Sequence, residues 1–241
     1  MGCLYFAGSL SYRTMILELP LYVSLVFGLT TLLAVWLFYR ATRQSKITLV
    51  VLLTWMALQA ALGLTGFYQQ TNSIPPRFPM LVVPPLLLIT GLLLIPHGRR
   101  FIDELRLDRL TLLHVVRIPV EVVLFWLFVG GVVPQVMTFE GRNFDILAGI
   151  TAPIIYYFRF INRKLSHTIL LVWNLVCLGL LTNIVLTAAL AVPSPFQQIA
   201  FEQPNVAILY FPFVWLPSVV VPIVVLAHVS ALRQLSQRLT Q

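Results

Sequence analysis

Apolar residues form long runs along the chain, and short polar segments separate them. A helix needs about 20 apolar residues to cross a bilayer, because the hydrocarbon core is about 30 Å thick. The pattern predicts an all-α integral membrane protein with seven transmembrane helices: Pro20–Phe38, Ile47–Phe67, Met80–Ile95, Leu110–Val133, Phe144–Ile161, Thr168–Val192 and Val206–Leu232. The third run is the shortest and contains Pro84 and Pro85, so six spans are the alternative.

Basic residues are concentrated in alternate polar segments, which gives the spans a direction. One set of segments carries Arg40, Arg43, Lys46, Arg99, Arg100, Arg106, Arg109, Arg159, Arg163, Lys164, Arg233 and Arg238, and the other set carries only Arg13, Arg77 and Arg142. Positively charged residues favour the cytoplasmic side of a membrane. We therefore expect the N-terminus outside and the C-terminus in the cytoplasm, which fits seven spans and does not fit six.

Composition supports a membrane location. The chain is 59% hydrophobic and 10% charged, whereas a soluble domain carries about 25% charged residues. The net charge of +8 is mostly a topology signal, and it favours contact with anionic lipid head groups. No basic cluster is interleaved with aromatic residues, so no nucleic-acid partner is expected. We expect one membrane domain over residues 1–241, in a plasma membrane or a bacterial inner membrane.

The two ends of the chain show weak internal similarity. Phe78-Pro79 and Pro84 match Phe211-Pro212 and Pro217 at one constant offset, and Arg100 then falls on Arg233. Residues 18–100 and 142–233 would form two repeats in one orientation, with residues 110–133 as the linker helix. This predicts a parallel 3+1+3 arrangement.

In architecture alone, this arrangement is similar to the SWEET sugar transporters and to opsin-like seven-helix proteins. The chain departs from both groups. Its Pro134-Gln135 pair ends the fourth span, whereas Pro-Gln pairs of the transporters lie in the repeated bundles. The last span contains no lysine for retinal attachment, and His228 is its only basic residue before the tail.

The fourth predicted span carries the strongest chemical signal. His114, Arg117 and Glu121 are spaced i, i+3 and i+7, which places them within about 60° of one helix face. A charge near the membrane midplane costs about 2.5–3.5 kcal/mol, so these residues need compensation. In one interpretation Arg117 and Glu121 pair directly and fix helix packing. In the other they line a polar cavity where Glu121 binds a solute or carries a proton.

Polar residues elsewhere could complete such a site. The outer segment between spans four and five is a candidate gate with Glu140, Arg142, Asn143 and Asp145, although Asn143 or Asp145 could simply cap the next helix. Trp173 and Asn174 offer an aromatic ring and an amide for a polar ligand, and helix packing explains them equally well.

The sequence favours no metal or other cofactor. His97, His114, His167 and His228 all fall towards the predicted cytoplasmic side, so a metal or haem site is the alternative. No two of them have the spacing of a metal pair on one helix. Cys3 and Cys177 are expected to be unpaired thiols.

The leading hypothesis is a protein that binds or transports a small solute, with proton linkage as an option, through the polar face of the fourth span. The alternatives are an intramembrane enzyme or redox protein that uses the histidines, and an accessory or scaffold subunit. The sequence contains no nucleotide-binding glycine loop and no hydrolytic triad, so we lean away from an enzyme. A homo-oligomer and a partner membrane subunit both remain open.

Overall fold

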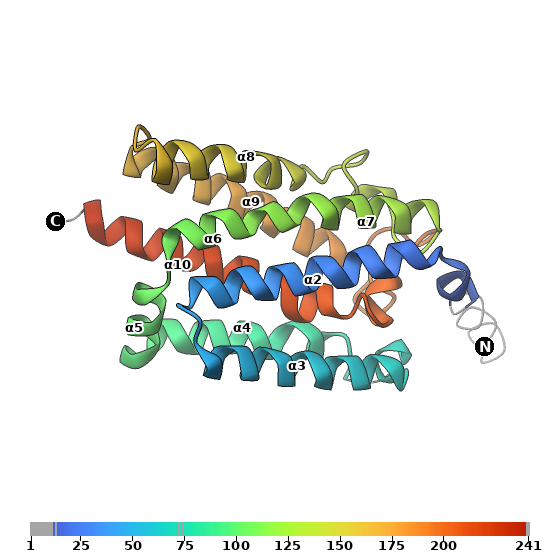
Figure 1. Cartoon of the computed structure of the whole chain (residues 1–241). Helices are drawn as coiled ribbons and strands as arrows, with labels where there is room; N and C mark the ends of the chain where they lie inside the picture. The colour runs from blue at the N-terminus through green and yellow to red at the C-terminus, as the bar shows by residue number, and fades with distance from the viewer. Residues whose placement is uncertain (1–11, 13, 72, 74, 240–241) are drawn as a thin grey trace.

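The computed structural model describes residues 12, 14–71, 73 and 75–239, and within that part every regular element is a helix. The long helices lie roughly along one common axis, and the first of them begins at the opposite end of the bundle from the end of the last one (Figure 1). We call these the C-terminal end and the opposite end. The main helices are α2 (Leu21–Ala41), α3 (Lys46–Leu64), α4 (Pro79–Leu94), α5 (Pro96–Glu104), α6 (Leu107–Leu113), α7 (Arg117–Val129), α8 (Ile146–Tyr156), α9 (His167–Leu190) and α10 (Val221–Leu239).

Several of these helices are long and apolar enough to cross a membrane. Among the described residues five qualify, and a sixth is added if α4 and α5 count as one bent span. Helix α8 continues through the π-helical turn η4 (Tyr157–Ile161) as a shorter apolar helix. Each of the seven predicted runs therefore contains a helix.

Helix α5 turns sharply away from α4, at an angle of 97°. Pro96 has no N–H and disfavours a helical conformation in the residue before it, and Ile95 accordingly has ψ of 135°. Two contacts then fasten α5 to α10. The Arg233 guanidinium donates to both carboxylate oxygens of Asp103 at 2.8 and 3.0 Å, and the Gln234 amide donates to the carbonyl of Ile102.

The predicted start of the last span is wrong. A helix from Val206 was expected, but the helical region begins ten residues later with the π-helical turn η6 (Leu216–Val220) and continues as α10. Pro212 inside a helix would remove a backbone hydrogen bond, whereas Pro217 fits a first turn. The intervening residues form a largely buried loop that contains the short 3₁₀ turn η5 (Ala207–Leu209), and the amides of Val206 and Ala207 both donate to the carbonyl of Val132.

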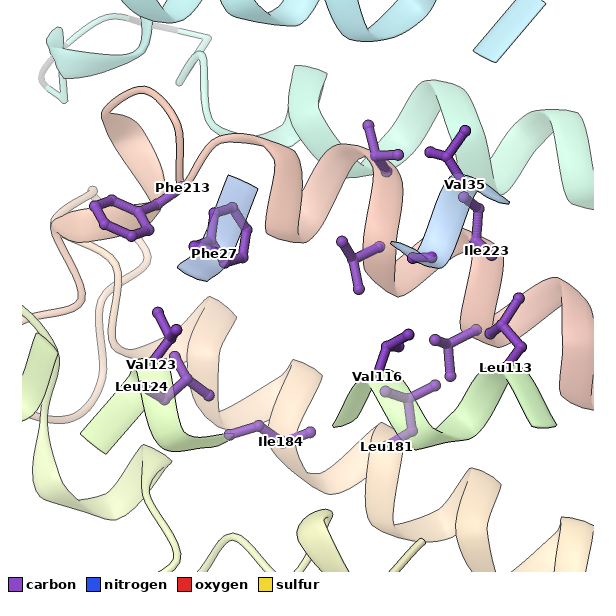
Figure 2. Close-up of a cluster of buried hydrophobic side chains, with 14 of the residues drawn as sticks. Phe27, Val35, Leu113, Val116, Val123, Leu124, Leu181, Ile184, Phe213 and Ile223 are labelled. Carbon is purple, nitrogen blue, oxygen red and sulfur yellow. The ribbon is translucent and has the colours of Figure 1, made fainter. Parts of the chain in front are cut away.

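Helix α10 is the central element. Within Leu216–Arg238, 67% of an apolar segment of 18 residues is buried, compared with 17% of the corresponding segment in α3. Figure 2 shows the core beside it, where residues of α2, α6, α7, α9 and α10 meet one residue of the turn η2 (His114–Val116) and one of the loop before η6: Phe27, Val35, Leu113, Val116, Val123, Leu124, Leu181, Ile184, Phe213 and Ile223. The proposed repeat pairs this central helix with the peripheral α4, and it stays a prediction.

Candidate functional site

The polar residues of the fourth predicted span lie at a break in its helical geometry. Helices α6 and α7 join through a 3₁₀ turn, η2 (His114–Val116), within the span Leu107–Val129. Pro119 lies in the first turn of α7, where a missing N–H is tolerated. The side chains of His114, Arg117 and Glu121 are all buried.

Arg117 forms its ion pair with Asp145, the residue just before α8, and not with Glu121. Its Nε lies 3.0 Å from Oδ2 of Asp145, and its Nη2 donates to the main-chain carbonyl of Cys177 on α9 at 3.2 Å. The interpretation in which Arg117 and Glu121 pair directly is therefore wrong. Residues one turn apart can meet, but here α8 brings a carboxylate to the guanidinium and Glu121 bonds to another group.

Asn143 provides that other group. Its Nδ2 donates to Oε1 of Glu121 at 2.5 Å and to the carbonyl of Met137 at 3.0 Å, while its Oδ1 accepts from the Asp145 amide at 3.1 Å. The Asp145 side chain does not cap α8, because its carboxylate is turned to Arg117. Arg117 and Glu121 of the predicted polar face thus form one buried cluster with Asn143 and Asp145 of the predicted outer gate.

The other two predicted gate residues lie outside this cluster. Glu140 and Arg142 are exposed. The main-chain carbonyl of Arg142 accepts a hydrogen bond from Asn183 at 3.2 Å, and its main-chain amide donates to the carbonyl of Val136 at 3.4 Å. We refer to Arg117, Glu121, Asn143 and Asp145 as the charged cluster.

Close packing of α8 against α7 holds the charged cluster together. A Cβ atom on Gly149 would lie 2.8 Å from Cγ1 of Ile118 and 3.3 Å from Cβ of Arg117. The absence of a side chain at Gly149 therefore lets α8 approach closely enough for Asp145 to reach Arg117.

We expect Gly149→Ala to destabilise the protein by about 1–3 kcal/mol, because the added methyl group overpacks this contact. Gly179→Ala is the matched control, since nothing lies within 4 Å of a Cβ there in α9. Thermal unfolding in a mild detergent measures both variants. Equal stability of the two would show that the α7–α8 contact is looser than described.

A pocket of about 270 Å³ lies beside the charged cluster. Its walls are apolar and come mainly from α4, α7, α9 and η6, and they include Val82, Val120, Leu181, Val185 and Leu216. Glu121 and Asp145 are the charged residues among its lining. Arg117 Nη1, Glu121 Oε2 and Asp145 Oδ1 are buried without a hydrogen-bond partner, so the cluster has unused polar capacity.

A family model matches residues 77–236, which include the whole charged cluster and the whole pocket lining. The family is described as a domain of unknown function, DUF8737. The chain belongs to the DUF8737 family. The DUF8737 match starts just before α4, so α2 and α3 precede it. No curated protein and no solved structure matches the chain.

A second buried polar group in this DUF8737 protein surrounds two histidines. The rings of His114 and His228 stack with centroids 4.0 Å apart, and Trp173 meets His114 edge-on at 5.5 Å. Asn174 donates to the Leu170 carbonyl, which leaves its Oδ1 to accept from Nδ1 of His228 at 3.0 Å. Trp173 and Asn174 thus support the histidine pair and do not line the pocket.

The four histidines do not come together. His97 is exposed on α5, and His167 lies 2.7 Å from the Arg159 guanidinium at the start of α9. Within the described part of the chain, no three His, Cys, Asp or Glu residues are grouped to hold a metal ion. Cys177 is a free, buried thiol, and Cys3 lies outside the described residues.

Sequence reasoning missed the main-chain groups of the site. The carbonyls of Cys177 and Met137 accept hydrogen bonds from Arg117 and Asn143. A pattern of side chains gives no signal for such acceptors. The apolar lining from α4 and α9 was also missed, because it looks like any other apolar helix face.

Proposed function

We propose that this protein spans the membrane seven times, with its C-terminal end in the cytoplasm, and binds or transports a small solute beside the charged cluster. The exposed basic residues Arg43, Lys46, Arg100, Arg163 and Lys164 support the orientation, because their segments all lie at the C-terminal end of the bundle (Figure 1). Helix α8 with η4 is about 24 Å long, and bilayer thinning or flanking side chains can accommodate so short a span.

The charge balance of the cluster carries the proposal. The cluster contains two buried carboxylates, on Glu121 and Asp145, and one guanidinium, on Arg117, which forms an ion pair with Asp145. A buried charge without a counter-ion is strongly unfavourable, so the second carboxylate needs a proton or a cation. Within the charged cluster, Glu121 forms no ion pair with a described residue, and its Oε2 has no hydrogen-bond partner.

The pocket favours a solute with an apolar body and a cationic head. An ammonium group would bind Glu121 while the apolar portion filled the space lined by Val82, Leu181 and Val185. With the solute absent, a proton on Glu121 would neutralise the same charge. Exchange of a proton for the solute is thus the basis of a proton linkage.

The test compares small primary amines, from methylamine to benzylamine, with benzyl alcohol as the uncharged counterpart. We expect at least one amine to raise the unfolding temperature of the purified protein, because a ligand that binds only the folded state stabilises it. Benzyl alcohol should have a smaller effect. In Glu121→Gln the amine effect should disappear.

Glu140→Gln is the matched control, because it makes the same chemical change on an exposed carboxylate. It should respond to the amines like the unmodified protein. If no amine stabilises the protein, or if Glu121→Gln responds as fully as Glu140→Gln, the solute site is refuted and a packing role for the charged cluster is favoured. Uptake of the stabilising amine into proteoliposomes then separates transport from binding alone.

A further inference from the structure

A second and larger pocket has a volume of about 530 Å³. It lies on the other side of η6 from the pocket beside the charged cluster, which we call the solute pocket after the proposed function. It runs between α3, α4 and α10, from Ser45 and Phe101 at the C-terminal end to Trp55 and Ser218 deeper in the bundle. The Trp55 indole donates to the Ser218 carbonyl at 2.9 Å and closes the inner end. We call it the inner-leaflet pocket, after its place in the proposed orientation.

The inner-leaflet pocket has the shape and surface that an acyl chain requires. Its walls are almost entirely apolar and include Val51, Leu52, Leu88, Leu92 and Ile223. From Ile47 to Trp55 it follows about 12 Å of helix α3, close to the ~15 Å depth of hydrocarbon in one leaflet. Val51 and Leu88 are 53% and 58% exposed, so a chain can enter from the side between α3 and α4.

Basic residues lie beside the pocket at the C-terminal end of the bundle. Lys46 lies between two lining residues, Ser45 and Ile47, and Arg100 precedes the lining residue Phe101. Both basic side chains are exposed, and neither forms an ion pair with another described residue. Helix α5 also carries two acidic residues. Asp103 forms an ion pair with Arg233, and Glu104 is exposed.

We infer that the inner-leaflet pocket binds one acyl chain of an anionic phospholipid from the cytoplasmic leaflet, with the phosphate held by Lys46 and Arg100. The apolar channel begins at the membrane surface, where these two cations meet the head groups, and it ends about one leaflet deep. Anionic lipids are concentrated in that leaflet and are attracted to basic residues there. The inference rests on the proposed orientation and does not depend on the solute site.

Native mass spectrometry of the purified protein tests the inference. The protein in detergent is titrated with phosphatidylglycerol or with phosphatidylcholine of the same chains, and retained lipid is counted. We expect one tightly retained phosphatidylglycerol. Each basic residue near a membrane surface contributes about a fivefold change in affinity, so Lys46→Gln/Arg100→Gln should weaken retention by about 25-fold.

Two further variants make the test specific. Arg163→Gln/Lys164→Gln removes two exposed charges in another segment at the same end, and it should retain phosphatidylglycerol normally. Leu88→Trp places a large ring in the channel and should reduce retention while the head-group residues remain intact.

Equal retention of the two lipids would overturn the inference, because it indicates unselective coating by lipid. Equal losses in the two double variants would also overturn it, because the effect would then be one of general surface charge. Unchanged retention in Leu88→Trp would exclude the channel. Each variant should keep the amine-induced stabilisation of the unmodified protein, which separates failure of this inference from failure of the solute site.

Discussion

Replacing Arg117 with leucine is expected to destabilise the folded protein by about 3–5 kcal/mol, the usual cost of removing one partner from a buried ion pair. Arg117 is 3% exposed, and its guanidinium is the cation of the charged cluster, where it forms an ion pair with Asp145. Without it, the buried carboxylates of Glu121 and Asp145, which both line the apolar pocket, have no ion-pair partner among the described residues. The Cys177 carbonyl would also lose its hydrogen bond from the side chain.

Removal of the opposite charge should restore much of this stability. In Arg117→Leu/Asp145→Leu the ion pair is replaced by apolar side chains, a change that is often neutral in buried sites. We expect the double variant to be more stable than Arg117→Leu alone. Arg233→Leu is the control, since its ion pair with Asp103 is partly exposed and should contribute little.

Unfolding of the purified protein in a mild detergent measures the four forms. If Arg117→Leu is as stable as Arg233→Leu, the buried Arg117–Asp145 ion pair contributes no more to the stability of the fold than the partly exposed one. If the double variant is less stable than Arg117→Leu, the two residues do not act as a pair.

Asn143→Ala is expected to lower the free energy of unfolding by about 2–3 kcal/mol. A buried polar group that loses its hydrogen-bond partner costs about 1–3 kcal/mol, and this variant leaves more than one such group without a partner. The Asn143 side chain forms hydrogen bonds with Glu121, the Met137 carbonyl and the Asp145 amide at once. Asn183→Ala is the matched control. It removes a single hydrogen bond from an exposed asparagine to the Arg142 carbonyl and should have little effect.

A second substitution separates the contribution of Glu121. Because neutral glutamine is easier to leave unpaired than a carboxylate, Asn143→Ala should cost less in a Glu121→Gln background. Unfolding temperatures of the two single variants and the double variant give the coupling. Purely additive effects would show that the 2.5 Å contact between Asn143 and Glu121 does not stabilise the fold.

The helices could be predicted from the sequence because apolar length alone indicates a membrane-spanning helix. Most helix ends agree with the predicted runs to within a few residues, as for Ile47–Phe67 and α3 (Lys46–Leu64). The start of the last helix was missed because residues 206–215 are as apolar as a span. They are buried as a loop against other parts of the chain, and hydropathy does not separate a buried loop from a helix.

The charged cluster was predictable in its members and not in its pairing. The spacing of His114, Arg117 and Glu121 on one helix indicated a polar face. The partner of each residue depends on the rotation and depth of α8 and α9, which no spacing within the fourth span determines. Asp145 was therefore assigned to an outer gate, although Gly149 brings it against α7.

The turn η6 forms a shared wall between the two pockets. Leu216 and Pro217 line the solute pocket, whereas Ser218 and Val219 line the inner-leaflet pocket. A rotation of this one turn would therefore reshape both cavities together. If the two occupants favour different rotations, each changes the affinity of the other by the same factor, since such coupling is reciprocal. The lipid composition of the membrane would then act as an effector of solute binding.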